Sequence, residues 1–314
     1  MSNSIKWIAS LRGLFVLFVF ISHEFNSILD KSILLAIGKI GVAGFFLISG
    51  YLAMTSIEKR NSKQFLFNRF IRLYPTYWIL LLMTIITAIL THQHLWSAKE
   101  ILANMTFFHQ YIGFNNIIGS SWMLSIMVVF FASLVLAAKK NKVGYFFVLF
   151  SIGAIVCGFL RYYFQKPFPT AIFLMSCMGF LGYFYHKHRF CTKNLHKLVI
   201  FEIVLAISGY LSYQQMLLFY EVAYNGAFLL FFIFSQRNLS ITIFNKLGKL
   251  GFTFFLGAGI PGVALSYTFP ILKSHSVIFI ITHFALCIIF SYLVTRFIEE
   301  PIIQSSKQLE KKFK

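Results

Sequence analysis

Two residues in the first apolar segment have side chains that could do chemistry. In "LRGLFVLFVFISH", residues 11–23, Arg12 stands near the start and His23 closes the segment. In a helix, eleven positions bring the two residues to within about 20° of the same face and ~16 Å apart along the axis. Histidine titrates near neutral pH and can act as a general base, whereas arginine stays charged and can hold an anion.

A charged side chain deep in a bilayer costs at least ~2.5–3.5 kcal/mol on insertion scales, so such residues often mark a functional path. A second interpretation fits the same spacing. Arg12 could reach back to the inner headgroups while His23 makes one structural hydrogen bond near the outer surface. Glu24 points about 100° away from His23 around the helix. We therefore rank Glu24 below His23 as a functional residue.

The composition indicates a protein embedded in a membrane. Apolar residues make up 58% of the 314 residues, only 12% are charged, and the mean hydropathy is +0.76. Ten apolar runs have the ~17–25 residues that cross a bilayer core. We predict an all-α, polytopic transmembrane bundle of about ten helices that forms one domain over residues 1–314, with the first run retained as a helix. The runs are 6–29, 33–57, 73–92, 121–138, 143–163, 168–186, 196–214, 216–235, 249–272 and 276–298.

The charge distribution predicts the orientation. An even number of spans puts both termini on one side, and most cations fall in loops on that side, so the positive-inside rule predicts cytoplasmic N- and C-termini. The net charge of +19 then reflects topology and anionic membrane lipids rather than a nucleic-acid partner. The cations placed inside lie at position 6, in 58–73, 139–142, 187–197 and 237–249, and in the tail from Arg296 to Lys314.

Several local patterns lead to further predictions. Tyr74, Tyr77 and Trp78 stand at the start of a run, as interfacial belt aromatics do. The polar stretch 93–120, expected outside, is long enough to line a binding surface. Pro301 predicts a helix end at Glu300, because the residue before a proline is pushed out of helical geometry. The cysteines Cys157, Cys177, Cys191 and Cys287 have no CxxC spacing and are expected to be packing residues, and no metal site is predicted.

Five segments in order resemble the acyltransferase-3 family of integral membrane acyltransferases. The first is the spacing from Arg12 to His23. The others are "GVAGFFLISGYL" (41–52), "FLFNRFIRLYPTYW" (65–78), "SSWMLSIM" (120–127) and "RFIEEP" (296–301). Glycines three apart in 41–52 also predict close helix packing.

The resemblance implies transfer of an acyl group, usually acetyl from acetyl-CoA, to a carbohydrate at the outer face of a bacterial cytoplasmic membrane. It implies His23 as the base with Arg12 beside the reaction, and a surface glycan or glycolipid, of O-antigen or capsule type, as acceptor. Arg69 and Arg72 are then expected to grip the phosphates of acetyl-CoA, as guanidinium groups do well, although the same pair could be a topology anchor. Trp122 could stack on a sugar or stand in an aromatic belt.

Two positions depart from the family pattern. Met127 stands where many members have a glutamate, and Ala258 in "LGKLGFTFFLGA" (247–258) stands where they have a histidine. Nothing obvious then orients the imidazole, since Glu24 and Glu202 are the acids left near membrane depth. A transporter or flippase with a polar path along Arg12 and His23 remains an alternative, for which paired helix interruptions are expected. A catalytically silent member of the family is a third.

Overall fold

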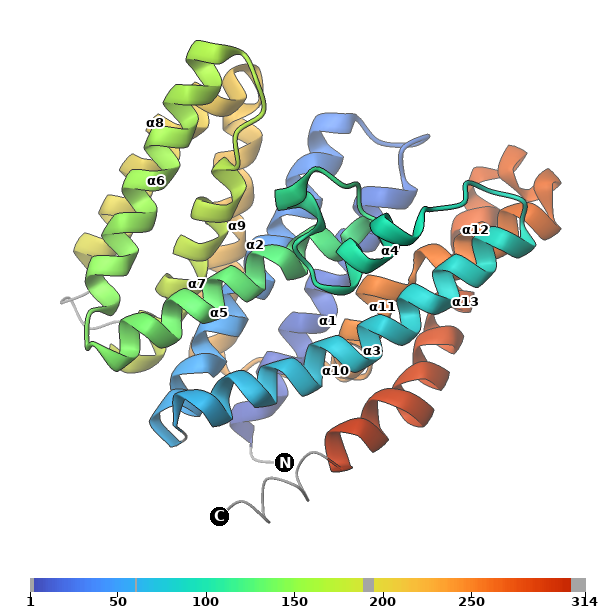
Figure 1. Cartoon of the computed structure of the whole chain (residues 1–314), viewed down its shortest axis with the longest axis horizontal. Helices are drawn as coiled ribbons and strands as arrows, with labels where there is room; N and C mark the ends of the chain where they lie inside the picture. The colour runs from blue at the N-terminus through green and yellow to red at the C-terminus, as the bar shows by residue number, and fades with distance from the viewer. Residues whose placement is uncertain (1–2, 60, 189–194, 306–314) are drawn as a thin grey trace. The chain divides into compact units, whose positions relative to one another are not determined.

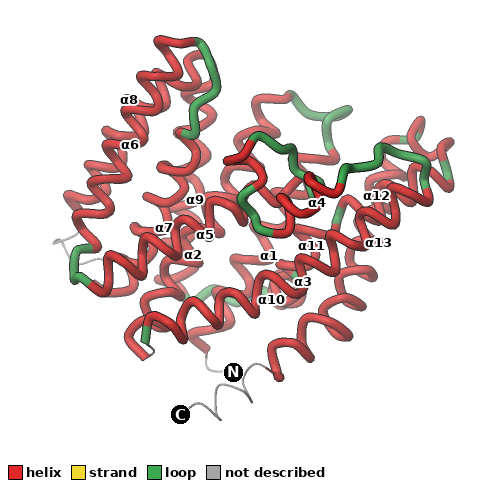
Figure 2. The backbone as a smooth tube through the Cα atoms, viewed as in Figure 1, coloured by secondary structure: helices red, strands yellow, loops and turns green. Residues whose placement is uncertain are grey.

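The structure is a computed structural model that describes residues 3–59, 61–188 and 195–305, and this part of the chain contains helices and loops but no strand (Figures 1 and 2). Two compact units are interleaved along the sequence. Unit 1 comprises residues 1–65 and 126–245, and unit 2 comprises residues 66–125 and 246–314. The predicted all-α membrane fold is confirmed.

Every predicted apolar run contains a helix, although the first run, 6–29, is helical only as far as Glu24. Within the described ranges, eight helices are long and apolar enough to cross a membrane, or nine if one bent pair counts as a span, against the ten predicted. The helices are α1 (Asn3–Glu24), α2 (Lys31–Lys59), α3 (Ser62–Leu90), α4 (Ala98–Met105), α5 (Trp122–Lys139), α6 (Val143–Phe164), α7 (Thr170–His188), α8 (Leu195–Tyr213), α9 (Leu217–Arg237), α10 (Thr242–Lys249), α11 (Gly251–Gly257), α12 (Gly259–Thr268) and α13 (Ser276–Val294).

Unit 1 is built around α2, which packs on α1, α7 and α9, while α6 packs on α7 and α8 (Figure 1). Glycines allow these close contacts. A Cβ atom at Gly41 would lie 2.6 Å from the Phe15 carbonyl oxygen, and one at Gly38 would lie 2.6 Å from Ser22 Oγ. On the α7 side, a Cβ at Gly50 would overlap the carbonyl oxygen of Gly179. The predicted role of the glycines in helix packing is confirmed.

Unit 2 contains most of α3, the segment with α4, and the C-terminal helices α11, α12 and α13. Helices α11 and α12 meet at Ala258 with a bend of 46°, so the predicted run 249–272 is a broken helix. In Figure 2 the connection between α3 and α5 is a long loop interrupted by the short helix α4. This segment corresponds to the polar stretch noted in the sequence.

Two predicted helix boundaries are wrong. Helix α3 begins at Ser62 rather than at residue 73, because exposed basic residues such as Arg72 do not interrupt a helix. The last helix also continues past Pro301 to Ser305. A π-helical turn at Thr295–Glu299 precedes the proline, and such a turn changes the hydrogen-bond register at the place where proline lacks an N–H.

Three of the cysteines, Cys157, Cys177 and Cys287, are buried and free, which confirms their role in packing. Some sequence-based predictions concern positions outside the described residues. These are Cys191 and the basic residues Arg60, Arg189, Lys193, Lys307, Lys311, Lys312 and Lys314.

Candidate functional site

Helix α1 carries both residues singled out by their spacing. It is continuous from Asn3 to Glu24, so Arg12 and His23 share a helix face as predicted. Arg12 is half-buried, and His23 is exposed in the last turn. The backbone carbonyl of His23 accepts a hydrogen bond from Asn26 Nδ2 (2.6 Å). The imidazole of His23 therefore stands at the end of the helix, where a reactant can reach it.

The face of α1 between these two residues is apolar. Val16 and Val19 occupy it and are 1% and 7% exposed. Val19 also lies against Gly41 of α2, where its Cγ2 atom would be 2.7 Å from an added Cβ. Arg12 and His23 thus stand at the two ends of a packed seam rather than on a continuous polar stripe.

Met127 has a polar neighbour in unit 1. Its side chain is 5% exposed, and its sulfur accepts a hydrogen bond from Ser49 Oγ (3.6 Å). Ser49 belongs to the Ser-Gly pair of the second-helix motif. The thioether is a weak acceptor that cannot take up a proton, so this position provides no acid or base.

Arg69 and Arg72 lie one turn apart near the start of α3, in unit 2. Arg69 is half-buried and Arg72 is exposed. Their spacing directs both guanidinium groups to the same side of the helix. The helix therefore presents two cations on one side. Both interpretations, a phosphate-binding pair and a topology anchor, are consistent with this arrangement.

The aromatic residues that follow on α3 bind the segment that comes after this helix. Tyr74 Oη donates to the Thr106 carbonyl (3.2 Å), Tyr77 Oη to the Asn104 carbonyl (3.1 Å) and Trp78 Nε1 to the Met105 carbonyl (2.9 Å). Asn104 and Met105 end α4, and Thr106 is its C-cap; the Asn104 carbonyl also accepts from Phe107 N (3.2 Å). Tyr77 is fully buried, so the prediction of an interfacial belt is wrong for this residue. It stays a prediction for Tyr74 and Trp78, which are half-buried.

Residues 98–121 consequently fold back along α3 instead of staying beyond its end. Helix α3 ends at Leu90, and Tyr77, which contacts the segment, is thirteen positions before that end. This separation corresponds to ~20 Å of helix. The side chain of Asn104, fully buried, holds the segment together. Its Nδ2 donates to the carbonyls of Glu100 and Asn115 (both 3.0 Å), and its Oδ1 accepts from Ile117 N (3.0 Å).

His109 is a buried base that the sequence argument did not select. Its Nε2 lies 2.7 Å from Asn116 Oδ1, to which Gln110 Nε2 (3.0 Å) and Ser121 Oγ (3.3 Å) also donate. Because that oxygen accepts, Nε2 carries the proton, and Nδ1 is buried without a hydrogen-bond partner in the described residues. Burial lowers the pKa of His109, and the hydrogen bond to Asn116 partly offsets this effect. In the sequence, the feature that pointed to His109 was its position in a polar loop.

Trp122 follows this cluster directly. It is half-buried at the first position of α5, immediately after Ser121, which is fully buried. The hydrogen bond from Ser121 to Asn116 thus fixes the entry to α5. The indole is held next to a rigid polar loop, which suits a stacking surface.

Ala258, the second departure from the family pattern, lies beside a histidine from another helix. The His283 Nε2–H donates to the Ala258 carbonyl (2.8 Å), and Cys287 Sγ is 3.6 Å from the same oxygen. His283 is 3% exposed. Its ring also fills the space beside Gly262, where an added Cβ would lie 2.8 Å from His283 Cε1. Side chains of α13 therefore support the break between α11 and α12.

The residues selected from the sequence belong to both units. Arg12 and His23 lie on α1 in unit 1, whereas Arg69, Arg72 and Trp122 lie in unit 2. The structure brings Arg12 and His23 to one face of one helix and Arg69 and Arg72 to one side of another. It also adds Asn104, His109 and His283 as buried polar residues.

The match with a known protein family covers residues of both units. A family model described as an acyltransferase domain matches residues 5–296. Curated proteins and solved structures give no match. The match contains the segment with Arg12 and His23, the basic start of α3, the segment before Trp122, and Arg296 at the start of the closing motif. This chain therefore belongs to the acyltransferase-3 family of membrane acyltransferases.

Proposed function

We propose that this protein transfers an acetyl group from cytoplasmic acetyl-CoA to a hydroxyl of a surface glycan, of O-antigen or capsule type, at the outer face of a bacterial cytoplasmic membrane. The observation that carries the proposal is the exposed imidazole of His23 at the end of α1, in a chain that the acyltransferase model matches over nearly its whole length. The donor, the acceptor and the direction of transfer are parts of this proposal.

The reaction needs a base for the acceptor. A sugar hydroxyl is a weak nucleophile, and His23 takes its proton as the oxygen attacks the thioester carbonyl. The new C–O bond forms, the C–S bond breaks, and the leaving CoA thiolate accepts a proton from the resulting imidazolium. General base catalysis of this kind is worth ~10²–10⁴-fold in rate. Because Met127 provides no carboxylate, His23 acts here without an acid at that position.

The arginines have separate roles in the proposal. Arg69 and Arg72 bind the phosphates of acetyl-CoA, because two guanidinium groups one turn apart suit that charge and shape. Arg12 stays charged and, at the other end of the apolar seam from His23, holds an anionic part of the donor. Trp122 provides a stacking face for the acceptor sugar. No metal is required for these steps.

The apolar seam of α1 favours this proposal over a flippase with a polar path along Arg12 and His23. Val16 and Val19 fill the helix face between the two residues, so no polar group lines it there. The described residues also contain one broken span, at Ala258, whereas paired interruptions were the expectation for a transporter.

A matched set of histidine variants tests the proposal. The purified protein in lipid nanodiscs is given labelled acetyl-CoA and the surface glycan of its host, and incorporation of acetyl groups is measured. We expect His23→Ala and His23→Gln to lower the rate by ~10²–10⁴-fold. The control is His275→Ala, because His275 is exposed and makes no side-chain cap at α13. Its rate should stay within about twofold of wild type.

Two results would contradict this function. If His23→Ala acetylates as fast as wild type, His23 is not the base. If the wild-type protein never transfers the label and the host glycan keeps its mass when the gene is deleted, the silent alternative holds. Arg69→Gln together with Arg72→Gln should raise KM for acetyl-CoA and leave KM for the glycan unchanged, which separates donor binding from catalysis.

A further inference from the structure

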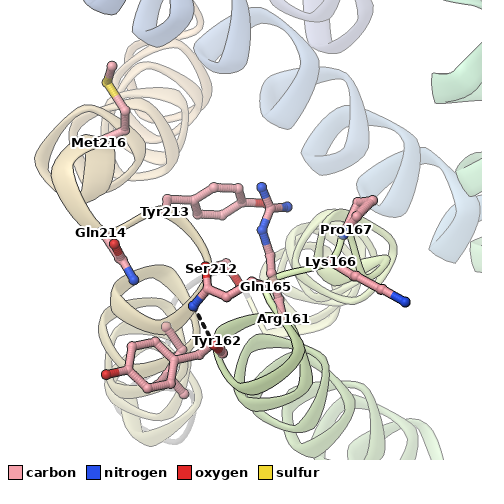
Figure 3. A pocket seen from close by; sticks show the side chains of 10 residues that line it. Arg161, Tyr162, Gln165, Lys166, Pro167, Ser212, Tyr213, Gln214 and Met216 are labelled. Carbon is pink, nitrogen blue, oxygen red and sulfur yellow. Dashed lines mark hydrogen bonds between the residues drawn. The ribbon is translucent and has the colours of Figure 1, made fainter.

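Unit 1 contains a polar pocket at the end of α6, away from the residues discussed so far. Its volume is about 500 Å³, within the ~300–1,000 Å³ typical of small-ligand sites. The last turn of α6, the connection to α7 and the connection from α8 to α9 form its walls (Figure 3). The polar lining residues are Arg161, Gln165, Lys166, Ser212, Tyr213 and Gln214.

Aromatic rings contact the positively charged side chains in and near this pocket. The guanidinium carbon of Arg161 lies 5.3 Å from the centre of the Tyr213 ring, and Figure 3 shows this group turned toward Tyr213. Tyr213 stacks on Tyr220 with ring centres 3.7 Å apart and planes 8° apart. Lys39 Nζ lies 5.7 Å over Tyr220. Two cations therefore bracket one pair of stacked rings.

The two cations of the pocket lining have no carboxylate partner among the residues that the structure describes. Arg161 instead makes its contact with Tyr213, and Lys166 is exposed. A cation that is packed on a ring and not neutralised by an acid remains able to bind an anion.

The backbone of the lining is unusual at two positions. Gln165 has φ of 50° and Gln214 has φ of 38°, in the left-handed region that residues other than glycine seldom adopt. Both residues line the pocket. Such conformations cost of order 1–3 kcal/mol and gather at ligand sites. The two connections are thus held in shapes that place amide side chains at the pocket.

The flank of the pocket has the character of a membrane interface. The end of α6 exposes large aromatic side chains, with Tyr162, Tyr163 and Phe164 at 46%, 70% and 52% exposure. Aromatic rings with a polar edge favour the headgroup level of a bilayer. An anion bound beside Arg161 would therefore have hydrocarbon next to it, as the phosphate of a lipid does.

We infer that this pocket binds a phosphate group, with Arg161 as its main cation and Lys166 and the glutamine amides around it. An anionic phospholipid is the source that the exposed aromatic flank favours, and a soluble phosphate would share the same chemistry. This site is independent of the acyl-transfer proposal, because it contains neither His23 nor any other residue assigned to the reaction.

The test measures lipid binding rather than activity. The intact protein is titrated in mixed micelles with phosphatidylglycerol, with phosphatidylcholine, or with soluble pyrophosphate, and bound molecules are counted by native mass spectrometry. We expect Arg161→Gln to weaken phosphatidylglycerol binding by about tenfold, as loss of one charge-assisted hydrogen bond does. Arg161→Lys should restore part of the binding, and Lys166→Gln should weaken it less than Arg161→Gln.

Lys142→Gln is the matched control. Lys142 also lies over a tyrosine, with its Nζ 5.9 Å from the Tyr145 ring centre, but it precedes the opposite end of α6. Its loss should change the affinity less than about twofold. The inference is overturned if Arg161→Gln and Lys142→Gln weaken binding equally. Phosphatidylcholine also carries a phosphate but no net charge, so binding as tight as that of phosphatidylglycerol would overturn the assignment to an anionic phospholipid. Pyrophosphate binding that depends on Arg161, without phosphatidylglycerol binding, assigns the site to soluble phosphate.

Discussion

Helix α2 in unit 1 and helix α3 in unit 2 hold their neighbours by different means. Helix α2 approaches α1 and α7 through glycines, and backbone meets backbone at Gly41 and Gly50. Helix α3 holds the segment 98–121 through hydrogen bonds from Tyr74, Tyr77 and Trp78. Close packing at glycines, which have no side chain, holds the first region together. Hydrogen bonds from polar side chains hold the second.

This difference matters for what each region can position. Small residues allow close packing over a long seam and fix the spacing of α1, which carries Arg12 and His23. Buried polar groups fix one conformation of an irregular segment, because each unpaired group would be costly. We therefore expect variants in the first region to act through packing and variants in the second through unpaired polar groups.

The largest effect is expected at the contact of α2 with α7. Gly50→Ala places a methyl group on the Gly179 carbonyl oxygen, so the helices must separate. We expect a loss of ~3 kcal/mol or more in the free energy of unfolding, at the upper end for overpacking, measured by denaturation in mixed micelles. Gly144→Ala is the control, because a Cβ there meets nothing within 4 Å. Equal stability of the two variants would show that α2 and α7 are not packed through Gly50.

A smaller effect is expected from the polar region. Asn104→Ala removes three hydrogen bonds and leaves buried backbone groups without partners, which costs ~2–4 kcal/mol in total. Proteolysis within residues 98–121 should become faster, as followed by gel electrophoresis. Asn115→Ala is the control, because the Asn115 side chain is exposed and its backbone carbonyl is kept. Faster cleavage of the control would contradict the role of the Asn104 side chain.

The smallest effect depends on pH. Burial lowers the pKa of His109 in the folded protein below the ordinary value of 6.5, so the unfolded chain binds more protons near that pH. The free energy of unfolding should therefore fall as pH drops below 6.5 and should be constant above it, as far as His109 contributes. His109→Gln should reduce this dependence in denaturation curves at pH 5.0, 6.5 and 8.0. An unchanged pH dependence in the variant would exclude His109 as its source.

The helices could be predicted because apolar length is a local property of the sequence. Each run long enough to span became helical, and the glycines of 41–52 identified a packed seam before any neighbour was known. The pairing of Arg12 with His23 on one face followed from helical phase alone. The apolar residues between them, Val16 and Val19, were visible too, but only the contact with Gly41 shows that they form a seam.

The polar region could not be predicted in the same way. From the sequence, Tyr74, Tyr77 and Trp78 suit a bilayer interface and a hydrogen-bonded cap equally well, and their hydrogen bonds depend on carbonyls at the end of α4, 27 to 32 residues later. The same holds for Pro301, where a π-helical turn before the proline keeps the helix going. His109 needed its partners Asn116 and Ser121 to stand out among the polar residues of its segment.

The break at Ala258 couples substitutions that are distant in the sequence. The ring of His283 supports the Ala258 carbonyl and occupies the space beside Gly262. A relative with a larger residue at the position of Gly262 should therefore have a smaller one at that of His283, and should hold the bend by another donor. Positions 262 and 283 should thus change together as sequences of this family diverge.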